Sequence, residues 1–182
     1  CMSIGANLEE CMLKSVRSLE IGVYHFKMAK FDSMPTEEIK GYLAEFHDDN
    51  IFGIAELIRR GVGTEEIHKI TKITEFFLKS IKNITDMEKK LSENKGDISV
   101  LKAAKIMGFS DKMIAVLWDM CELDVSNIRK QNGIVPAFRM VDTAHVGVYI
   151  PYLYSSYTGE NESRLTDKKK VIVLGAGPIR IG

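Results

Sequence analysis

The sequence predicts a mainly α-helical protein: a compact domain of several short helices, followed by an extended connector and one terminal β-strand that begins a further α/β domain. Two observations support the helices: apolar residues recur at helical spacing through most of the chain, and caps and glycines separate these stretches. A third supports the rest, because β-branched and aromatic residues that favour extended backbone become frequent after residue 133.

The first expected helix begins after Asn7, a good N-cap, with the carboxylate of Glu10 three residues later. Gly22 would stop it. Its apolar stripe would consist of Leu8, Met12, Val16 and Leu19. The short stub before it offers this stripe no partner, so we expect the helix to close an upstream domain and the chain to be a piece of a longer protein.

Four further helices are expected before residue 92. Pro35 opens one, residues 48–50 cap the next, which ends at residues 59–61, and Thr64 and Thr74 start the other two. The expected apolar faces are Ile39, Leu43 and Phe46, then Ile51, Ile54 and Ile58, and in the long last helix Phe77, Ile81, Ile84, Met87 and Leu91.

A polar linker at residues 92–97 separates these helices from a second helical group. Leu101 and Ala104 would face inward up to Gly108. Ser110 would cap a helix carrying Ile114, Leu117 and Trp118, and Asp124 would cap another carrying Val125 and Ile128 before Gly133. The short turns predict one all-α domain over residues 29–140, with an extended connector at residues 141–167.

The end of the chain carries the one motif that points to a ligand. The aliphatic run at residues 171–174 reads as a buried strand, and glycines one residue apart, Gly175 and Gly177, begin turns that cradle phosphates. A dinucleotide fingerprint would need a small residue where Arg180 stands. Gly175, Gly177 and Gly182 are therefore weak candidates for cofactor binding, because an ordinary Gly-Pro turn explains the same spacing.

Composition narrows the classes of function. Lys and Arg number 25 and so do Asp and Glu, which gives no global field toward nucleic acid or an anionic membrane. No apolar run is long enough to span a bilayer, and three cysteines without C-x-x-C spacing suggest a reducing, cytoplasmic setting. The four histidines show no metal-ligand spacing, so we expect no metal site and no catalytic residue.

DNA binding by helix-turn-helix units is the alternative function. Residues 63–91 and 108–133 each read as helix, turn, helix. In the second unit four acids outnumber three bases, which argues against it because a recognition helix must neutralise phosphates. A small effector between the helices is a third possibility, although no cluster of polar residues points to one.

Ten segments, in this order along the chain, carry a resemblance to a known family. They are MSIG at 2–5, LEIG at 19–22, RRG at 59–61, IHKIT at 67–71, FFL at 76–78, GFSD at 108–111, GIVP at 133–136, VDT at 141–143, YSSY at 154–157 and VLGAGPIRIG at 173–182. Together they resemble the large chain of carbamoyl phosphate synthase. One departure is AHVG at 144–147, where the family usually has small and acidic residues.

The resemblance implies a fragment of an ATP-dependent carbon-nitrogen ligase. Residues 1–28 would be the closing helix of the first, carboxyphosphate-forming half, and residues 29–140 the helical oligomerisation domain. Residues 168–182 would be the first strand and glycine turn of the second half. The parent enzyme would use two ATP with Mg or Mn and a glutamine amidotransferase small subunit. The fragment itself would be a non-catalytic spacer that self-associates.

Overall fold

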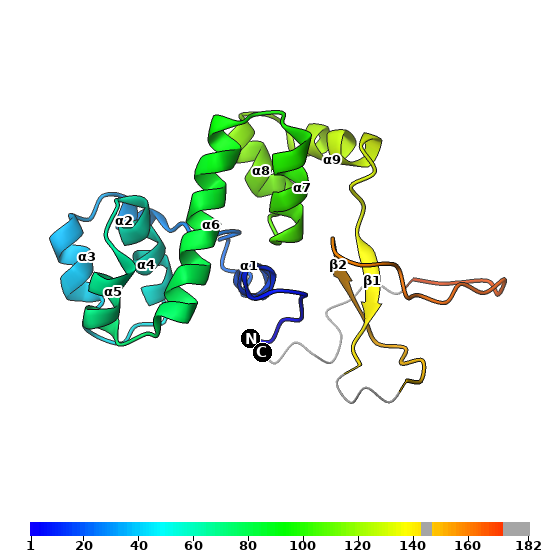
Figure 1. Cartoon of the computed structure of the whole chain (residues 1–182), viewed down its shortest axis with the longest axis horizontal. Helices are drawn as coiled ribbons and strands as arrows, with labels where there is room; N and C mark the ends of the chain where they lie inside the picture. The colour runs from blue at the N-terminus through cyan, green and yellow to red at the C-terminus, as the bar shows by residue number, and fades with distance from the viewer. Residues whose placement is uncertain (143–146, 173–182) are drawn as a thin grey trace.

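The computed structural model describes residues 1–142 and 147–172, and within them the chain is mainly helical, as predicted (Figure 1). The order of elements is α1 (Leu8–Ser18), α2 (Ala29–Asp32), α3 (Thr36–Tyr42), α4 (Asn50–Arg59), α5 (Thr64–Thr71), α6 (Glu75–Glu93), α7 (Ile98–Ile106), α8 (Asp111–Trp118), α9 (Glu122–Gln131), β1 (Ala137–Met140) and β2 (Leu153–Ser156).

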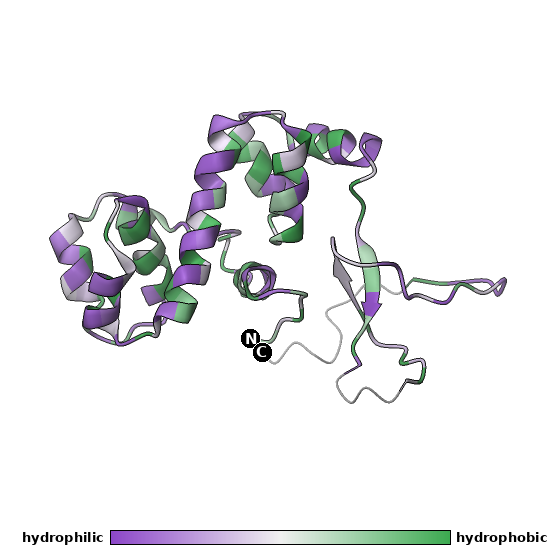
Figure 2. Ribbon diagram, viewed as in Figure 1, coloured by the Kyte–Doolittle hydropathy of each residue, from purple (hydrophilic) through white to green (hydrophobic). Residues whose placement is uncertain are grey.

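The long helix α6 joins two groups of helices. Figure 1 shows α2 to α5 gathered beside one end of α6 and α7, α8 and α9 toward the other, with α1 on the same side as α7 and beside the middle of α6. Helices α4 and α5 pack on α6 from the first group, and α1, α7 and α8 pack on it from the second. Figure 2 shows hydrophilic and hydrophobic residues alternating along α6, as expected for a helix that is buried on one side only.

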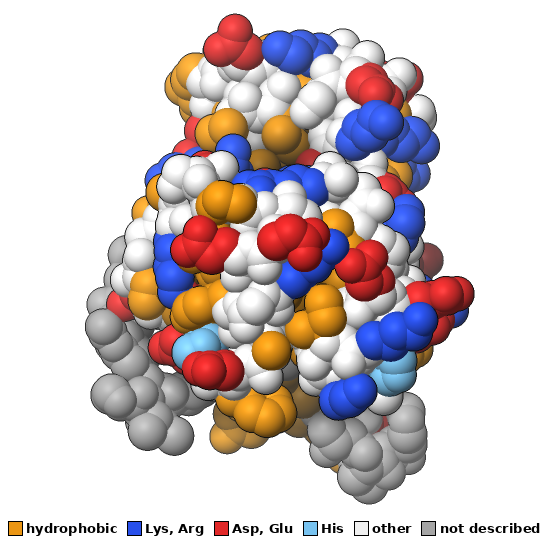
Figure 3. Space-filling view, turned by 90° about the vertical axis from the view of Figure 1, so that its left-hand side faces the viewer, with side chains coloured by type: hydrophobic (Ala, Val, Ile, Leu, Met, Phe, Trp, Pro, Cys, Tyr) orange, Lys and Arg blue, Asp and Glu red, His pale blue; other side chains and the backbone are white. Residues whose placement is uncertain are grey.

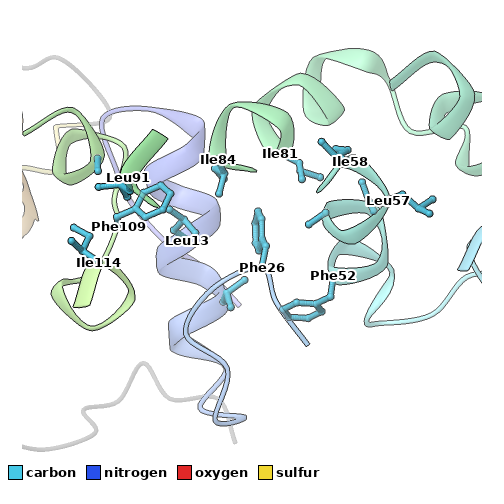
Figure 4. Close-up of a cluster of buried hydrophobic side chains, with 14 of the residues drawn as sticks. Leu13, Phe26, Phe52, Leu57, Ile58, Ile81, Ile84, Leu91, Phe109 and Ile114 are labelled. Atoms are coloured by element: carbon cyan, nitrogen blue, oxygen red, sulfur yellow. The ribbon is translucent and has the colours of Figure 1, made fainter. Parts of the chain in front are cut away.

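A single apolar cluster runs through both groups. Figure 4 shows Phe26 between the side chains of Ile84 on α6 and Phe52 on α4. The rings of Phe26 and Phe52 meet edge to face, with centroids 6.4 Å apart. The loop between α1 and α2 therefore contributes a side chain that ties the two groups of helices together.

The predicted start of α1 is confirmed. Its predicted end is wrong, and its predicted apolar stripe is buried only in part. Asn7 Oδ1 accepts a hydrogen bond of 2.8 Å from the backbone N–H of Glu10. The helix ends at Ser18, because Glu20 takes a left-handed conformation with φ 54° before Gly22 is reached. Of the expected stripe, Val16 is buried, Met12 is partly buried against the core and Leu19 is 45% exposed. The other buried positions of the helix are Glu10 and Leu13, so α1 is covered on more than one side.

Two aromatic residues expected in the core are exposed. Helix α3 ends at Tyr42, so Phe46 lies beyond it in the turn before α4 and is 96% exposed. On α6 the neighbouring Leu78 is fully buried and Phe77 is 45% exposed. In both cases the neighbouring element, rather than the period of the sequence, decides which side is covered.

Helix α9 also begins earlier than expected. Its N-cap is Cys121, and Asp124 lies inside the first turn. An acid in the first turn still favours the helix, because the N–H groups there carry partial positive charge. By contrast, Ser110 caps α8 as predicted and accepts a hydrogen bond of 3.1 Å from the N–H of Met113.

Extended backbone was predicted after residue 133, but the pairing of two strands was not. Strands β1 and β2 pair antiparallel, with Ala137 opposite Ser156 and Met140 opposite Leu153. On the outer side of β1, the N–H of Phe138 donates to Asn161 Oδ1, and the carbonyl of Phe138 accepts from the N–H of Glu162. This segment occupies an edge that could otherwise pair with another strand.

Strand β2 docks on α1, far away in the sequence. Lys14 Nζ donates to the carbonyl of Ser155 at 2.6 Å, and Ser156 Oγ donates to Glu10 Oε2 at 3.1 Å. The assignment of residues 1–28 to a first ATP-using half stays a prediction, and this packing shows that α1 shares the core of the helices that follow. Residues 173–182, with half of the expected terminal strand, lie outside the described residues, and Val171 and Ile172 are 88% and 83% exposed.

Candidate functional site

A surface hollow lies between α8 and the segment that links α1 to α2. It has a volume of about 620 Å³, and we call it the α8 hollow. Its exposed apolar lining comes from Ile21, Tyr24 and Val116, which are 52%, 45% and 70% exposed. Met28 and Met113 also line it. Three exposed apolar side chains around one concave surface make the hollow a candidate contact surface.

Local structure explains why these side chains are exposed. In the linking segment, the side chains of His25 and Phe26 are buried and anchor the backbone. Tyr24, the residue before them, is exposed. On α8, Ile114, Ala115 and Trp118 form the buried face, which leaves Val116 on the opposite side.

Lysine side chains surround the apolar lining. Lys27, Lys30 and Lys112 line the hollow, whereas its one carboxylate is that of Asp32. The ammonium of Lys112 lies 3.6 Å from the centroid of the Tyr24 ring, within the range of a cation–π contact. Lys27 Nζ is 3.8 Å from Asp32 Oδ2. Three ammonium groups and one carboxylate give the lining of the α8 hollow, at its rim, a net positive charge, although Lys30 is also paired with Asp49 outside it.

A protruding turn, residues 43–49, adjoins this rim, and we call it the Phe46 turn. Lys30 Nζ donates to Tyr42 Oη at 2.7 Å and to Asp49 Oδ2 at 2.8 Å. Hydrogen bonding to Asp49 is the main reason that the pKa of Lys30 is raised. The rings of Tyr42 and His47 stack with centroids 4.0 Å apart. These contacts hold the base of the turn, while Phe46 itself projects into solvent.

Other exposed apolar side chains lie apart from the hollow. Phe76 and Phe77, at the start of α6, meet edge to face with centroids 5.3 Å apart. Figure 3 shows the face of the molecule that carries the α2 to α5 group, where hydrophobic side chains are interspersed with acidic and basic ones. The α8 hollow is distinct because its apolar residues surround a concave surface.

A buried ionic cluster holds the two groups of helices together. Arg59 on α4 donates to both carboxylate oxygens of Glu88 on α6, at 2.7 Å each, and to the carbonyl of Phe26 at 2.5 Å. His25 Nε2 contacts the same carboxylate. Burial alone would raise the pKa of Glu88, but hydrogen bonds from Arg59 and His25 outweigh it, so the pKa is lowered. This cluster joins three segments.

A second cavity, of about 740 Å³, lies beside this cluster. Arg59 and Glu88 line it together with Lys82, Asp86 and Lys89 of α6. Lys82 is paired with Asp86, and Lys89 lies 3.9 Å from Glu93. Because these charges already have partners, the cavity offers no concentrated field for a charged ligand.

A second ionic cluster ties the last helices to the end of β2. Asp111 accepts from Lys105 Nζ and from Arg129 Nε, each at 2.7 Å. Burial lowers the pKa of Lys105, and this effect outweighs the hydrogen bond to Asp111, which would raise the pKa. The ring of Tyr157 lies 4.7 Å from Lys105 Nζ, and burial raises the pKa of its phenol. The cluster fixes α7, α8, α9 and the segment after β2 relative to one another.

The candidate cofactor-binding glycines and one of the four histidines cannot be placed. Gly175, Gly177, Gly182 and His145 lie outside the described residues. His68 Nδ1 contacts the carbonyl of Ile73 at 2.7 Å, and His25 and His47 have the partners given above. Within residues 1–142 and 147–172, no group of three or more His, Cys, Asp or Glu side chains is placed to hold a metal ion. The cysteines are free thiols.

Sequence reasoning missed the ionic cluster at Glu88 and the α8 hollow. The cluster left one signal, since Glu88 falls between Ile84 and Leu91 on the apolar face of α6, where a lone charge needs a buried partner. The hollow left none, because its lining comes from two segments about ninety residues apart.

The second helix-turn-helix unit of the sequence corresponds to α8 and α9. Arg129, one of its three bases, is mostly buried and paired with Asp111. The unit therefore presents even fewer cations than its sequence suggested, and no observation favours duplex binding. None of the helices in the described part of the chain is both long and apolar enough to cross a membrane.

A comparison with known protein families gives a match over most of the chain. Residues 1–133 match the family described as carbamoyl-phosphate synthetase large chain, oligomerisation domain. The match covers α1 to α9, so it includes the α8 hollow, the Phe46 turn and the cluster at Glu88.

Proposed function

The chain belongs to the carbamoyl-phosphate synthetase large-chain family through its oligomerisation domain, and from this we infer that it is a non-catalytic module through which the large chain associates with further copies of itself. The observation that carries the proposal is the α8 hollow, with exposed apolar side chains at Ile21, Tyr24 and Val116. An apolar patch ringed by charges is typical of the surfaces through which subunits associate.

The chemistry of the described residues supports a binding role rather than a catalytic one. The buried titratable groups Glu88, Asp111 and Lys105 are each saturated by partners within the fold. A general acid or base must instead face a substrate with a free position. These three groups serve to fix helices.

The path of the chain supports a spacer role. Because α1 and β2 contact each other through Glu10 and Ser156, the chain enters and leaves the helical body at neighbouring points. Catalytic parts attached before α1 and after β2 would be held at a fixed spacing. In the parent enzyme these would be two ATP-using halves, with ATP and Mg or Mn bound there.

The parent enzyme would make carbamoyl phosphate from bicarbonate, glutamine-derived ammonia and two ATP, for arginine and pyrimidine synthesis. A glutamine amidotransferase small subunit would supply the ammonia. A cytoplasmic setting is part of the same proposal. Isolated residues 1–182 should then hydrolyse no ATP, which a phosphate-release assay with Mg or Mn checks.

Sedimentation equilibrium over a range of concentrations tests self-association. We expect the weight-average mass to rise above the monomer value of 20.5 kDa as concentration increases. A mass that stays at the monomer value up to millimolar concentration would contradict the proposal and leave only a spacer.

A further inference from the structure

We propose that the Phe46 turn of one copy inserts into the α8 hollow of a second copy, and that the second copy does the same in return about a two-fold axis. This inference rests on the proposed self-association and assigns to it a surface and a register. The partner is a second copy of the same chain.

Phe46 is suited to act as a knob, that is, a side chain that inserts into a hollow of the partner copy. It is 96% exposed, yet the turn around it is ordered by its own hydrogen bonds. Asn50 Nδ2 donates to the carbonyl of Glu45 at 2.7 Å, and the N–H of Asn50 donates to the carbonyl of His47 at 3.3 Å. An aromatic side chain on an ordered turn loses little entropy on binding, because the backbone is already fixed.

The α8 hollow is suited to receive an aromatic ring. Pockets of about 300–1,000 Å³ hold drug-sized ligands, and the volume here, about 620 Å³, lies in that range. The lining residues Ile21, Met28, Met113 and Val116 offer apolar contact, and Tyr24 offers an aromatic edge. The thioethers of the two methionines can adapt to the shape of a ring.

Charge is complementary between the two surfaces. Glu45 and Asp48, on either side of Phe46, are exposed acids. Lys27 and Lys112, on the rim of the hollow, are exposed bases. An acidic knob facing a basic rim favours this register and disfavours contact of two knobs or of two hollows.

The positions of knob and hollow favour a two-fold arrangement. Lys30 lines the hollow and also binds Tyr42 and Asp49 at the base of the Phe46 turn, so the two features are neighbours on one surface. A two-fold interface brings the same patch of both copies together, with each residue i meeting j and each j meeting i. Both knobs can then be buried in one interface.

Single substitutions test the two halves of the surface. Phe46→Ala removes the knob, and Val116→Arg fills the hollow and adds a base to its rim. Each should weaken the association constant by at least about tenfold, as expected for the centre of an interface. Phe76→Ala is the matched control, since it deletes an equally large, 67% exposed ring at another place and should change association by less than about twofold. Circular dichroism melts would verify that all three remain folded.

Mixing the two variants distinguishes this register from other contacts. Homodimers of either variant have no intact knob-in-hollow contact, whereas a mixed dimer has one, with Phe46 of the Val116→Arg copy entering the hollow of the Phe46→Ala copy. We expect sedimentation of a one-to-one mixture to show more dimer than either variant alone. A mixture no more associated than its components would overturn the two-fold register.

The outcomes separate this inference from the proposed function. If the unmodified chain is monomeric at every concentration, both are wrong. If it associates and the Phe46 and Val116 variants associate equally well, self-association stands and the interface lies elsewhere, for example at Phe76 and Phe77. In that case only this inference is overturned.

Discussion

Individual buried charges hold this fold at chosen points, and Glu88 is the clearest case. Its carboxylate receives two hydrogen bonds from Arg59 and contacts His25, so it neutralises a cation that is itself largely buried. A buried ion pair adds little over a well-packed apolar pair, but removal of one partner leaves the other charge uncompensated. The stability of the protein should therefore respond strongly to the loss of this one carboxylate.

Glu88→Gln keeps the shape of the side chain and removes its charge. We expect the free energy of unfolding to fall by about 3 kcal/mol, because Arg59 stays buried with only the longer contact to Glu56, of 3.4 Å, to balance its charge. Urea unfolding at pH 7 measures this. Asp86→Asn on the same helix is the control, because Asp86 and its partner Lys82 are exposed and such pairs contribute about 0–1 kcal/mol. Equal effects of the two substitutions would contradict the role of the cluster.

Acid should destabilise the protein through the same carboxylates. The pKa values of Glu88 and Asp111 lie below their ordinary values of 4.5 and 3.8, because hydrogen bonds from basic partners outweigh the effect of burial. A lowered pKa contributes stability that is present above the unfolded value and is lost as pH falls through the folded value. Urea unfolding should show a decline in stability that begins as pH falls below about 5 and continues through the lowered pKa values of these groups. Glu88→Gln should flatten it, and an unchanged slope would contradict this assignment.

Elements are fixed by close backbone contacts as well as by charges. Gly108, between α7 and α8, has φ 95°, and a Cβ atom there would lie 2.7 Å from the Cα of Glu10 on α1. Arg17 donates to the carbonyl of Gly108 at 3.0 Å. The turn between α7 and α8 thus touches the backbone of α1 directly, so glycine is required both by the conformation and by the space.

Gly108→Ala should separate these two requirements when it is compared with Gly133→Ala. Gly133 has φ 69° with open space around it, so its substitution introduces backbone strain alone, about 1 kcal/mol. At Gly108 the clash with α1 adds to the strain, and we expect a total loss of about 3 kcal/mol or more. Thermal unfolding of both variants checks this. Similar losses would show that α1 moves away at little cost.

At the scale of the whole molecule, α6 makes the two groups of helices one cooperative unit. Its buried residues contact α4 and α5 at one end and α1, α7 and α8 at the other. Phe26 and the cluster at Glu88 add links between the groups. A division into two independently unfolding parts would break all of these contacts, so the helical body should unfold in one step.

Leu78→Ala and Leu91→Ala test this at the two ends of α6. Both leucines are fully buried. Leu78 lies near the start of α6, and Leu91 lies near its end, where the carbonyl of Leu91 accepts a hydrogen bond from Trp118 of α8. Each substitution should cost about 2–5 kcal/mol and lower the midpoint of one shared transition. Calorimetry measures this. Two transitions, of which each variant shifts only one, would contradict a single unit.

The sequence by itself determined where most of the helices lie, because the signals for them are local. Asn7 and Ser110 cap helices within three residues of themselves, and Gly61 ends α4 through its own conformation. The family could also be recognised, since its short segments keep their order along the chain. These features depend on the backbone and on residues that are neighbours in the sequence, so they can be predicted from the sequence alone.

Only the tertiary structure decided which faces are covered and which remain free. The pairing of β1 with β2, the partner of Glu88 and the exposure of Phe46 each depend on segments far apart in the chain. An apolar residue at helical spacing is buried only if another element packs over it, and spacing alone does not name that element. The candidate association surface, a hollow between residues 21–32 and α8, was invisible in the sequence for this reason.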